Sequence, residues 1–343
     1  MTDATPSSHT PTDSPATFDV CGIGNALVDV LSHGTDELVD ELGIVKGSMT
    51  LVDEERAQEV YGRTGPGIEM SGGSAANTIV GVASLGGRAR YIGKVRDDAL
   101  GAVFGHDLRA TGVSYDTAAA TGGPSTGCCV IVVTPDAQRT MHTFLGASVH
   151  LGPSDVDAAA IADAKVTYLE GYLFDPPEAQ EAFRTAARLA HDAGRAVAAT
   201  LSDSFCVQRH REAFLDLVEH HVDLLFANEA EILELYGTDN FDEAVAGVRA
   251  HGAVAALTRS EKGSVVVTAD AVIEVPAHPV DHVEDTTGAG DLYAAGFLFG
   301  WSRGLSLERC AELGSLAAAE VISHLGARPA TSLADLAADL LDG

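Results

Sequence analysis

Two glycines and an acidic residue lie close together in the segment EDTTGAGDLYAAGF, residues 284–297. Glycine lets the backbone at 288–290 turn tightly with its N–H groups exposed, and the helix predicted for 290–302 directs its free amides to the same place. Such a helix start binds anions. Asp291 in its first turn could accept a proton from an alcohol while the amides stabilise negative charge. This combination indicates phosphoryl transfer; the alternative is an ordinary helix entry in which Asp291 only balances the helix dipole.

Three other nucleotide-binding patterns are missing from the sequence. The segment GKV at 93–95 lacks the upstream glycine and the hydroxyl residue of a P-loop. The glycine-rich loop, catalytic loop and metal-binding triad of protein kinases are absent as well. The segment GIGNAL at 22–27 lacks the third glycine of a dinucleotide-binding fingerprint, which makes a dehydrogenase an unfavoured alternative.

The elements that must position these residues alternate regularly in the second half of the chain. In order, the pattern predicts strand 165–171, helix 177–193, strand 196–201, helix 210–221, strand 222–227, helix 229–236, strand 253–258, a hairpin at 264–275, and helices 290–302, 306–323 and 332–341. Strands that alternate with helices form right-handed crossovers, which predicts a mostly parallel sheet covered on both faces. Because ligands bind at the carboxyl ends of such strands, the polar clusters that follow them should converge at one edge.

The first half of the chain is less regular. Residues 18–31 are predicted to form one strand whose end carries Asn25 and Asp29. Short β segments follow at 30–71, and 128–147 reads as a hairpin with Pro and Asp at its turn.

Composition limits the class of protein. At 343 residues and 46% hydrophobic, the chain is long enough for one large α/β domain with a smaller appendage. A formal net charge of −29 argues against nucleic acid or an anionic membrane as partner, because both would repel it. Five scattered cysteines with apolar neighbours predict buried free thiols and a cytoplasmic location. Residues 1–17 read as a disordered tail, and no apolar run reaches membrane-spanning length.

Two long segments resemble the signatures of the ribokinase or PfkB-type carbohydrate and nucleoside kinases. DTTGAGD at 285–291 is similar to their C-terminal signature, and SGGSAANTIVGVASLGGRARYIGKVRDDALG at 71–101 to their N-terminal one. Within the family, GIGNALVDV and GIVKGSMTLVDEERAQEVY look most like adenosine kinases. The resemblance implies an α/β, ribokinase-like three-layer sandwich over 18–343, with a mostly parallel central sheet and a small β lid from about 30–71 and 124–149.

The same resemblance implies ATP and Mg²⁺ as cofactors and assigns the catalytic residues. Asp291 would be the catalytic base. The anion hole would be formed by Gly288, Ala289 and Gly290. NEAE resembles the family's N-x-x-E motif and would place Asn228 and Glu231 near Mg²⁺ and the phosphates, with Glu231 acting through water. The alternative is that Asn228 only caps the helix at 229–236.

Two further segments resemble the family's nucleotide-binding elements. TRSEKG matches the T-x-G-x-x-G pattern at Thr258 and Gly263 but has Ser260 where relatives often have glycine. Ser315 stands where relatives often carry His or Asn at the adenine pocket; the alternative for it is a position in a core helix.

The predicted substrate residues come mainly from the first strand and the glycine pair. Asp29 can accept two ribose hydroxyls, and Asn77 can add a hydrogen bond. An acid in an apolar strand is costly unless it is paired or liganded, which favours a functional role. The glycines would let the backbone approach the sugar or would serve helix packing. The set is Asn25, Asp29, Gly72, Gly73, Ser74 and Asn77.

Four other residues have alternatives that the sequence leaves open. Arg139 would reach phosphate or substrate from the lid, or would be a solvated turn residue. Tyr172 would stack on a purine, or would belong to the core. Asp285 and Thr287 resemble positions that hold a monovalent cation such as K⁺ in ribokinase, although adenosine kinases vary here.

Together these patterns predict an ATP- and Mg²⁺-dependent kinase that phosphorylates the primary 5′-hydroxyl of a nucleoside, with adenosine converted to AMP. The alternatives are a kinase of ribose, fructose, a keto-sugar acid, inosine or guanosine, or a catalytically silent protein that binds such a small molecule. A monomer and a homodimer both remain open.

Overall fold

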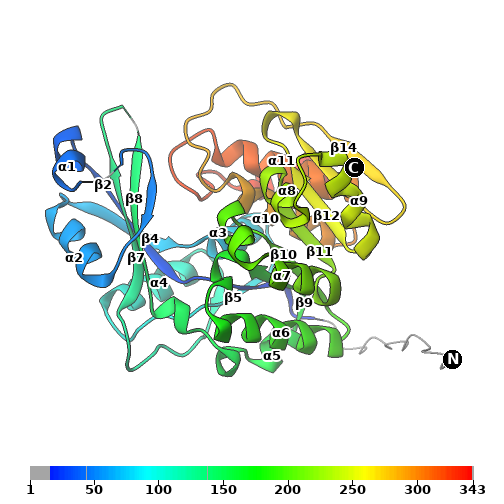
Figure 1. Cartoon of the computed structure of the whole chain (residues 1–343), viewed down its shortest axis with the longest axis horizontal. Helices are drawn as coiled ribbons and strands as arrows, with labels where there is room; N and C mark the ends of the chain where they lie inside the picture. Colours follow the sequence, from blue (N-terminus) through cyan, green and yellow to red (C-terminus); the bar gives the residue numbers. More distant parts are fainter. Residues whose placement is uncertain (1–15, 44, 137, 342–343) are drawn as a thin grey trace.

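The computed structural model describes residues 16–43, 45–136 and 138–341. It has a large layered part and a smaller sheet beside it (Figure 1). Most of the predicted tail, 1–15, lies outside the described residues. Ala16 is buried, and the backbone N–H of Thr17 donates to Asp163 at 2.8 Å.

Among the described residues, nine strands form the larger sheet, in the order β14-β13-β12-β11-β10-β9-β1-β5-β6. Neighbouring strands are parallel except for the β12–β13 and β13–β14 pairs. This confirms the predicted mostly parallel sheet. The strands are β1 (Phe18–Ile23), β5 (Ala89–Ile92), β6 (Ser114–Tyr115), β9 (Ala164–Glu170), β10 (Ala196–Thr200), β11 (Leu224–Asn228), β12 (Val254–Thr258), β13 (Ser264–Val267) and β14 (Val272–Val275).

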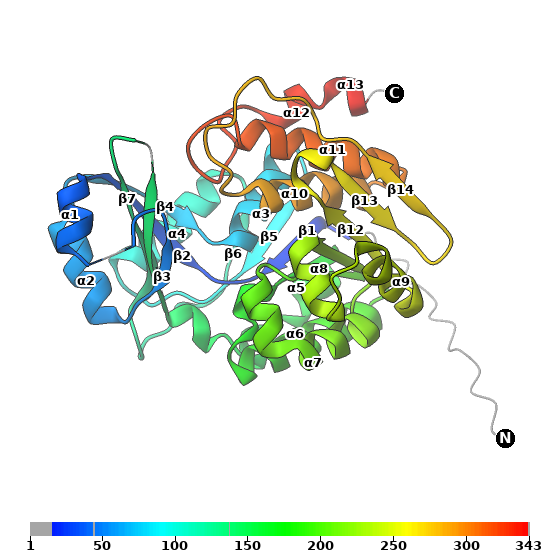
Figure 2. The same cartoon turned by 45° about the horizontal axis from the view of Figure 1, so that its top comes forward.

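Helices cover both faces of the larger sheet, which makes three layers (Figure 2). The strands need apolar residues on both sides; Ala198 of β10 packs into one core, whereas Val197 and Ala199 pack into the other. One core includes α3 (Ser74–Ser84), α10 (Ala289–Ser302) and α11 (Leu307–Val321). The other includes α5 (Ala158–Ala162), α6 (Pro177–Asp192), α7 (Ser204–His221), α8 (Glu229–Tyr236) and α9 (Phe241–His251).

Two predicted helices have different bounds in the structure. The helix predicted for 210–221 begins at Ser204, because Asp203 caps its N-terminus, and His210 has non-helical dihedrals inside it. The helix predicted for 332–341 is two short helices, α12 (Leu333–Leu336) and α13 (Ala338–Leu341).

A second sheet of five strands in the described chain has the order β3-β8-β7-β2-β4. Its strands are β2 (Leu27–His33), β3 (Met49–Leu51), β4 (Gly67–Gly72), β7 (Thr126–Val133) and β8 (Arg139–Gly146). One face packs against α1 (Asp36–Glu41) and α2 (Glu54–Arg63), and α4 (Ala99–Ala110) adjoins β4. The opposite face is lined by an apolar group that includes Leu31, Cys129, Ile131, Val133 and Met141. We call this the inner face of the second sheet.

The single strand predicted for 18–31 is wrong. The chain leaves the larger sheet after Ile23 and enters the second sheet as β2. Gly24 sits so close to Glu170 that a Cβ there would lie 2.4 Å from a Glu170 carboxylate oxygen. The main-chain N–H of Asn25 donates to that same side chain at 3.1 Å, so strand pairing ends here. Asp29 therefore belongs to the second sheet rather than to the end of β1.

Two other expectations bear on the class of protein. All five cysteines are buried and free, as predicted. In the part of the chain that the structure describes, every helix is too short or too polar to cross a membrane.

Candidate active site

Helix α10 begins at a tight turn that only glycine makes without strain. Gly288 has a φ of 82°, and a Cβ there would lie 2.8 Å from the Cα of Ala327. Gly290 is exposed, and a Cβ there would meet nothing within 4 Å. The protein's own packing therefore does not require glycine at 290. The N–H of Ala289 donates to the carbonyl oxygen of Thr286 at 3.2 Å, whereas no backbone carbonyl among the described residues accepts from the N–H groups of Gly288 and Gly290, so these two can donate to an anion.

Asp291 is held by two donors from α3. The Ser74 hydroxyl donates to Oδ1 at 2.6 Å, and the Asn77 amide donates to Oδ2 at 3.1 Å. Burial raises the pKa of Asp291 to about 6, against the lowering effect of these two hydrogen bonds. A carboxyl group with this pKa is mostly ionised at neutral pH and can still accept a proton, as a general base must.

Asp29 reaches the same region from β2. A Cβ on Gly72 would lie 2.3 Å from its Oδ2, so the glycine makes room for the carboxylate. No donor among the described residues hydrogen-bonds to Asp29. Burial raises its pKa to about 6; Arg328 and Arg139 oppose that rise and Asp291 adds to it. A half-buried carboxylate with free lone pairs is suited to accept hydrogen bonds from the hydroxyl groups of a ligand.

Asn25 is already occupied by the protein. Its amide donates to Glu170 at 2.7 Å, and its side-chain oxygen accepts from the Ser148 hydroxyl at 2.8 Å. Gly73 has a φ of 101° and lies so close to the backbone of Asn25 that a Cβ on Gly73 would be 2.3 Å from the Asn25 carbonyl oxygen. Asn25 thus joins the two sheets, while Ser74 and Asn77 bind Asp291.

Glu170 belongs to this region as well, although it was not among the site residues predicted from the sequence. Its carboxylate accepts from the backbone and side chain of Asn25 and from the N–H of Ala75 at 2.7 Å. It is 1% exposed, and burial raises its pKa to about 7. It connects the end of β9 to the start of α3. The sequence does contain an indication of this role: Glu170 is the last residue of the apolar strand segment VTYLE, and an acid in such a strand must be paired.

Arg139 connects the second sheet to the glycine loop. Its guanidinium forms an ion pair with Asp285, and both side chains are about 10% exposed or less. The solvated-turn alternative for Arg139 is therefore wrong. Asp285 also accepts from the hydroxyl of Thr287 at 2.6 Å and from the N–H of Gly326 at 3.1 Å. The positive charge beside Asp285 in this structure is the guanidinium.

On the other side of Asp291, Asn228 and Glu231 form a reciprocal cap on α8. The side-chain oxygen of Asn228 accepts from the Glu231 N–H at 2.9 Å, and the Asn228 amide donates to the Glu231 carboxylate at 2.7 Å. Burial, with Asp203 and Asp291 nearby, raises the pKa of Glu231 to about 7. In the part of the chain that the structure describes, no three His, Cys, Asp or Glu side chains are grouped as metal ligands. Glu231 alone is consistent with Mg²⁺ bound through water, because this ion keeps several waters and takes few protein ligands.

The predicted nucleotide-binding segment, residues 258–263, begins at the last residue of β12, the strand next to β11. Thr258 pairs with Asn228 across β12 and β11. Ser260 is exposed with a φ of 53°, a left-handed conformation that favours glycine. Gly263 has a φ of 86°, and a Cβ would lie 2.2 Å from the carbonyl oxygen of Val275. Ser315, on α11, accepts from the N–H of His278 at 2.7 Å.

Tyr172 lies in the 3-10 helix Gly171–Phe174, directly after β9. It is 38% exposed, so the alternative of a core position is wrong. Partial burial and the carboxylates of Asp203 and Asp291 raise the pKa of its phenol.

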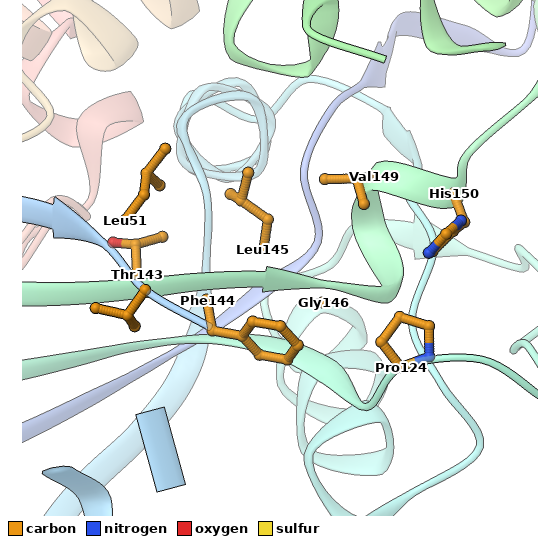
Figure 3. A pocket seen from close by; sticks show the side chains of 9 residues that line it. Leu51, Pro124, Thr143, Phe144, Leu145, Gly146, Val149 and His150 are labelled. Carbon is orange, nitrogen blue, oxygen red and sulfur yellow. The ribbon is translucent and has the colours of Figure 1, made fainter. Parts of the chain in front are cut away.

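A pocket of about 310 Å³ lies at the end of β8. Figure 3 shows its side chains, with Phe144 facing Pro124. Three of its residues, Leu51, Thr143 and Leu145, are on the same face of the second sheet as Asp29, as the strand registers show. The lining is Leu51, Val52, Pro124, Thr143, Phe144, Leu145, Gly146, Val149 and His150.

Comparison with known proteins gives consistent matches. A family model described as pfkB family carbohydrate kinase matches residues 42–333. The ATP-dependent ribose-1-phosphate kinase of Halopiger xanaduensis is 30% identical over 278 residues, covering 79% of this chain and 87% of that protein.

Two solved structures are more similar in sequence. A probable sugar kinase from Rhizobium etli has a TM-score of 0.87 at 51% identity and covers 95% of this chain and 99% of its own. An adenosine kinase from Sinorhizobium meliloti has a TM-score of 0.87 at 53% identity and covers 94% of this chain and 99% of its own.

Proposed function

The chain belongs to the pfkB family of carbohydrate kinases, and on this premise we propose that it transfers the γ-phosphate of ATP to the primary 5′-hydroxyl of adenosine. As a member of that family it is a phosphotransferase that acts on a hydroxyl group of a sugar or nucleoside. The choice of a nucleoside is the proposal.

One observation carries this choice: on the acceptor side, the half-buried carboxylate of Asp29 has no hydrogen-bond partner among the described residues and lies beside the apolar inner face of the second sheet. Asp29 projects from the same face of β2 as Leu31, and Ile131 and Met141 continue that face. A carboxylate can accept both hydroxyls of a ribose. A base attached to the ribose would cover apolar surface that a free sugar leaves in water.

In this mechanism Asp291 takes the proton of the attacking hydroxyl. Ser74 and Asn77 hold its carboxylate by hydrogen bonds of 2.6 and 3.1 Å, and the free amides among residues 288–290 stabilise the transferring group. Bound Mg²⁺ would neutralise negative charge on the phosphates. Asn228 and Glu231 would hold the metal, with Glu231 acting through water.

The second sheet would keep water away from the reaction. It reaches the glycine loop through the ion pair of Arg139 and Asp285. Water would otherwise compete with the acceptor for the phosphate, so a covering element is needed in such a kinase. The unpaired cysteines support our proposal of a reducing, cytoplasmic location.

The experiment is ADP release from ATP and Mg²⁺ with a panel of adenosine, inosine, guanosine, ribose, fructose and ribose 1-phosphate. We expect kcat/KM for adenosine to exceed that for ribose by about 100-fold, since burial of a base contributes a few kcal/mol. Ribose or ribose 1-phosphate as the better acceptor would contradict the nucleoside assignment and retain the phosphotransferase. Added KCl, compared with NaCl, would show whether Asp285 and Thr287 serve a monovalent cation.

A further inference from the structure

Arg328 lies in the segment between α11 and α12, which reaches toward the second sheet (Figures 1 and 2). Its side chain is only 14% exposed. The Nε donates to the side-chain oxygen of Asn77 at 3.3 Å, and Nη1 donates to Asp107 at 3.2 Å. Burial lowers the pKa of Arg328, and the carboxylates of Asp107 and Asp29 oppose that effect. None of the roles assigned above uses this residue.

The contact with Asn77 determines which way its amide points. A guanidinium can only donate hydrogen bonds, and an ionised carboxylate can only accept them. Asn77 therefore presents its oxygen to Arg328 and its NH₂ group to Asp291. A flipped amide would face a donor with a donor and an acceptor with an acceptor.

This constraint matters most when Asp291 is protonated. A protonated carboxyl group also donates, so Asp291 by itself no longer requires the NH₂ group of Asn77. Arg328 still requires the oxygen. The guanidinium thus keeps the amide in place through the proton transfer.

The second contact links this arrangement to the second sheet. The Asp107 oxygen that accepts from Arg328 also accepts from the backbone and the hydroxyl of Ser71. Ser71 is the residue of β4 next to Gly72, the glycine beneath Asp29. A continuous set of hydrogen bonds therefore connects β4, Asp107, Arg328, Asn77 and Asp291.

We propose that Arg328 is a positioning residue for phosphoryl transfer: it orients the Asn77 amide toward Asp291 and ties that contact to β4 through Asp107. The proposal rests on the proposed role of Asp291 as base. It does not depend on which acceptor the enzyme prefers.

A double-mutant cycle tests it with the full chain, ATP, Mg²⁺ and the acceptor that the wild-type protein uses best. We expect Arg328→Met and Asn77→Ala each to lower kcat by about 10- to 100-fold, because a misplaced base costs this much. The KM for ATP should change less than about threefold, since neither residue contacts the nucleotide side. The double variant should be no slower than Asn77→Ala, and Arg328→Lys should recover part of kcat.

Arg303→Met is the matched control. This arginine lies at the far end of α10, 3.7 Å from Asp19 and over the Phe299 ring, so its loss should leave kcat unchanged. Multiplicative losses of kcat in the double variant would overturn the proposal, because Arg328 would then act independently of Asn77. So would a normal kcat in Arg328→Met.

The same cycle measured by urea unfolding needs no acceptor. Non-additive losses of unfolding free energy would support the contact, and additive losses would overturn it. Absence of turnover in the wild-type protein with every acceptor would count against the proposed function, whereas the unfolding cycle would still decide whether Arg328 and Asn77 act together.

Discussion

The acceptor side and the nucleotide side of the candidate site satisfy their polar groups in different ways. On the acceptor side, Asp29 has no hydrogen-bond donor among the described residues, and burial raises its pKa to about 6. On the nucleotide side, Asn228 and Glu231 satisfy each other in a helix cap, and Ser315 binds the backbone of His278. Unpaired charge is therefore concentrated where the acceptor would bind.

This difference has an energetic meaning. The pKa values of both Asp29 and Glu231 are raised by burial, so both carboxylates cost stability when ionised. Glu231 already has its hydrogen-bond donors in the cap, whereas Asp29 would gain them only from a ligand. We expect substitutions on the acceptor side to harm activity more than stability. On the nucleotide side, we expect substitutions to change stability as well, through the helix cap and the backbone conformation of the turn.

The largest effect should come from the base. Asp291→Asn keeps the shape of the side chain and removes proton acceptance, so kcat should fall by about 1,000-fold, within the usual range for a general base. ADP release at saturating substrates is the measurement. A near-normal kcat in a folded variant would mean that Asp291 is only a helix-dipole partner.

The next effect should come from Asp29→Asn. Loss of charge-assisted hydrogen bonds should lower kcat/KM for the acceptor by about 10- to 100-fold. The unliganded variant should nevertheless have a higher Tm than wild type at pH 7.5. The folded pKa of about 6 lies above the ordinary value of 3.8, so ionised Asp29 destabilises the fold.

The pH dependence of this Tm difference provides the control. As the pH falls below about 6, Asp29 becomes protonated first in the folded chain and then, below 3.8, in the unfolded chain, so the Tm difference should shrink and vanish below pH 3.8. A Tm difference that grows on acidification would contradict the assignment of unpaired charge to the acceptor side.

A smaller effect should follow from Glu231→Gln. Glutamine retains an oxygen to accept from the Asn228 N–H, but it removes the charge that would hold Mg²⁺, so half-maximal activity should need about tenfold more Mg²⁺. Glu229→Gln is the control, because Glu229 lies two residues earlier in α8 and is paired with Arg259 at 2.9 Å. Equal Mg²⁺ dependence in both variants would leave Glu231 with a capping role only.

The smallest effects should come from the turn after β12. Ser260→Gly relieves a left-handed serine and should stabilise the protein by up to about 1 kcal/mol in urea unfolding. Gly263→Ala should destabilise it, because its φ is 86° and the new Cβ would lie 2.2 Å from the Val275 carbonyl oxygen. The two substitutions should therefore change the free energy of unfolding in opposite directions. A change in the same direction for both would show that backbone strain is not the cause.

Several features of the fold and site could be predicted from the sequence because their causes are local. Alternating apolar strands and helices predicted the larger sheet, and the bounds of α6 and α8 lie within one residue of the predicted ones. The turn at Gly288 and the placement of Asp291 in the first turn of α10 depend on dihedral angles and hydrogen bonds within a few residues. The Asn228–Glu231 cap spans three residues and is equally local.

Other features depend on residues far apart in the chain, and only the tertiary structure decided them. Asn25 and Glu170 are 145 residues apart, yet their contact ends β1 and moves Asp29 to the second sheet. Arg139 and Asp285 are 146 residues apart, and Asn77 and Arg328 are 251 apart. The sequence by itself determined most of the elements of the larger sheet, the glycine turn and the place of Asp291 in the first turn of α10, since propensity and capping act over short distances. The position of Asp29 and the partners of Asp285 and Asn77 were decided by packing, because burial and charge select among groups that only the folded chain brings together.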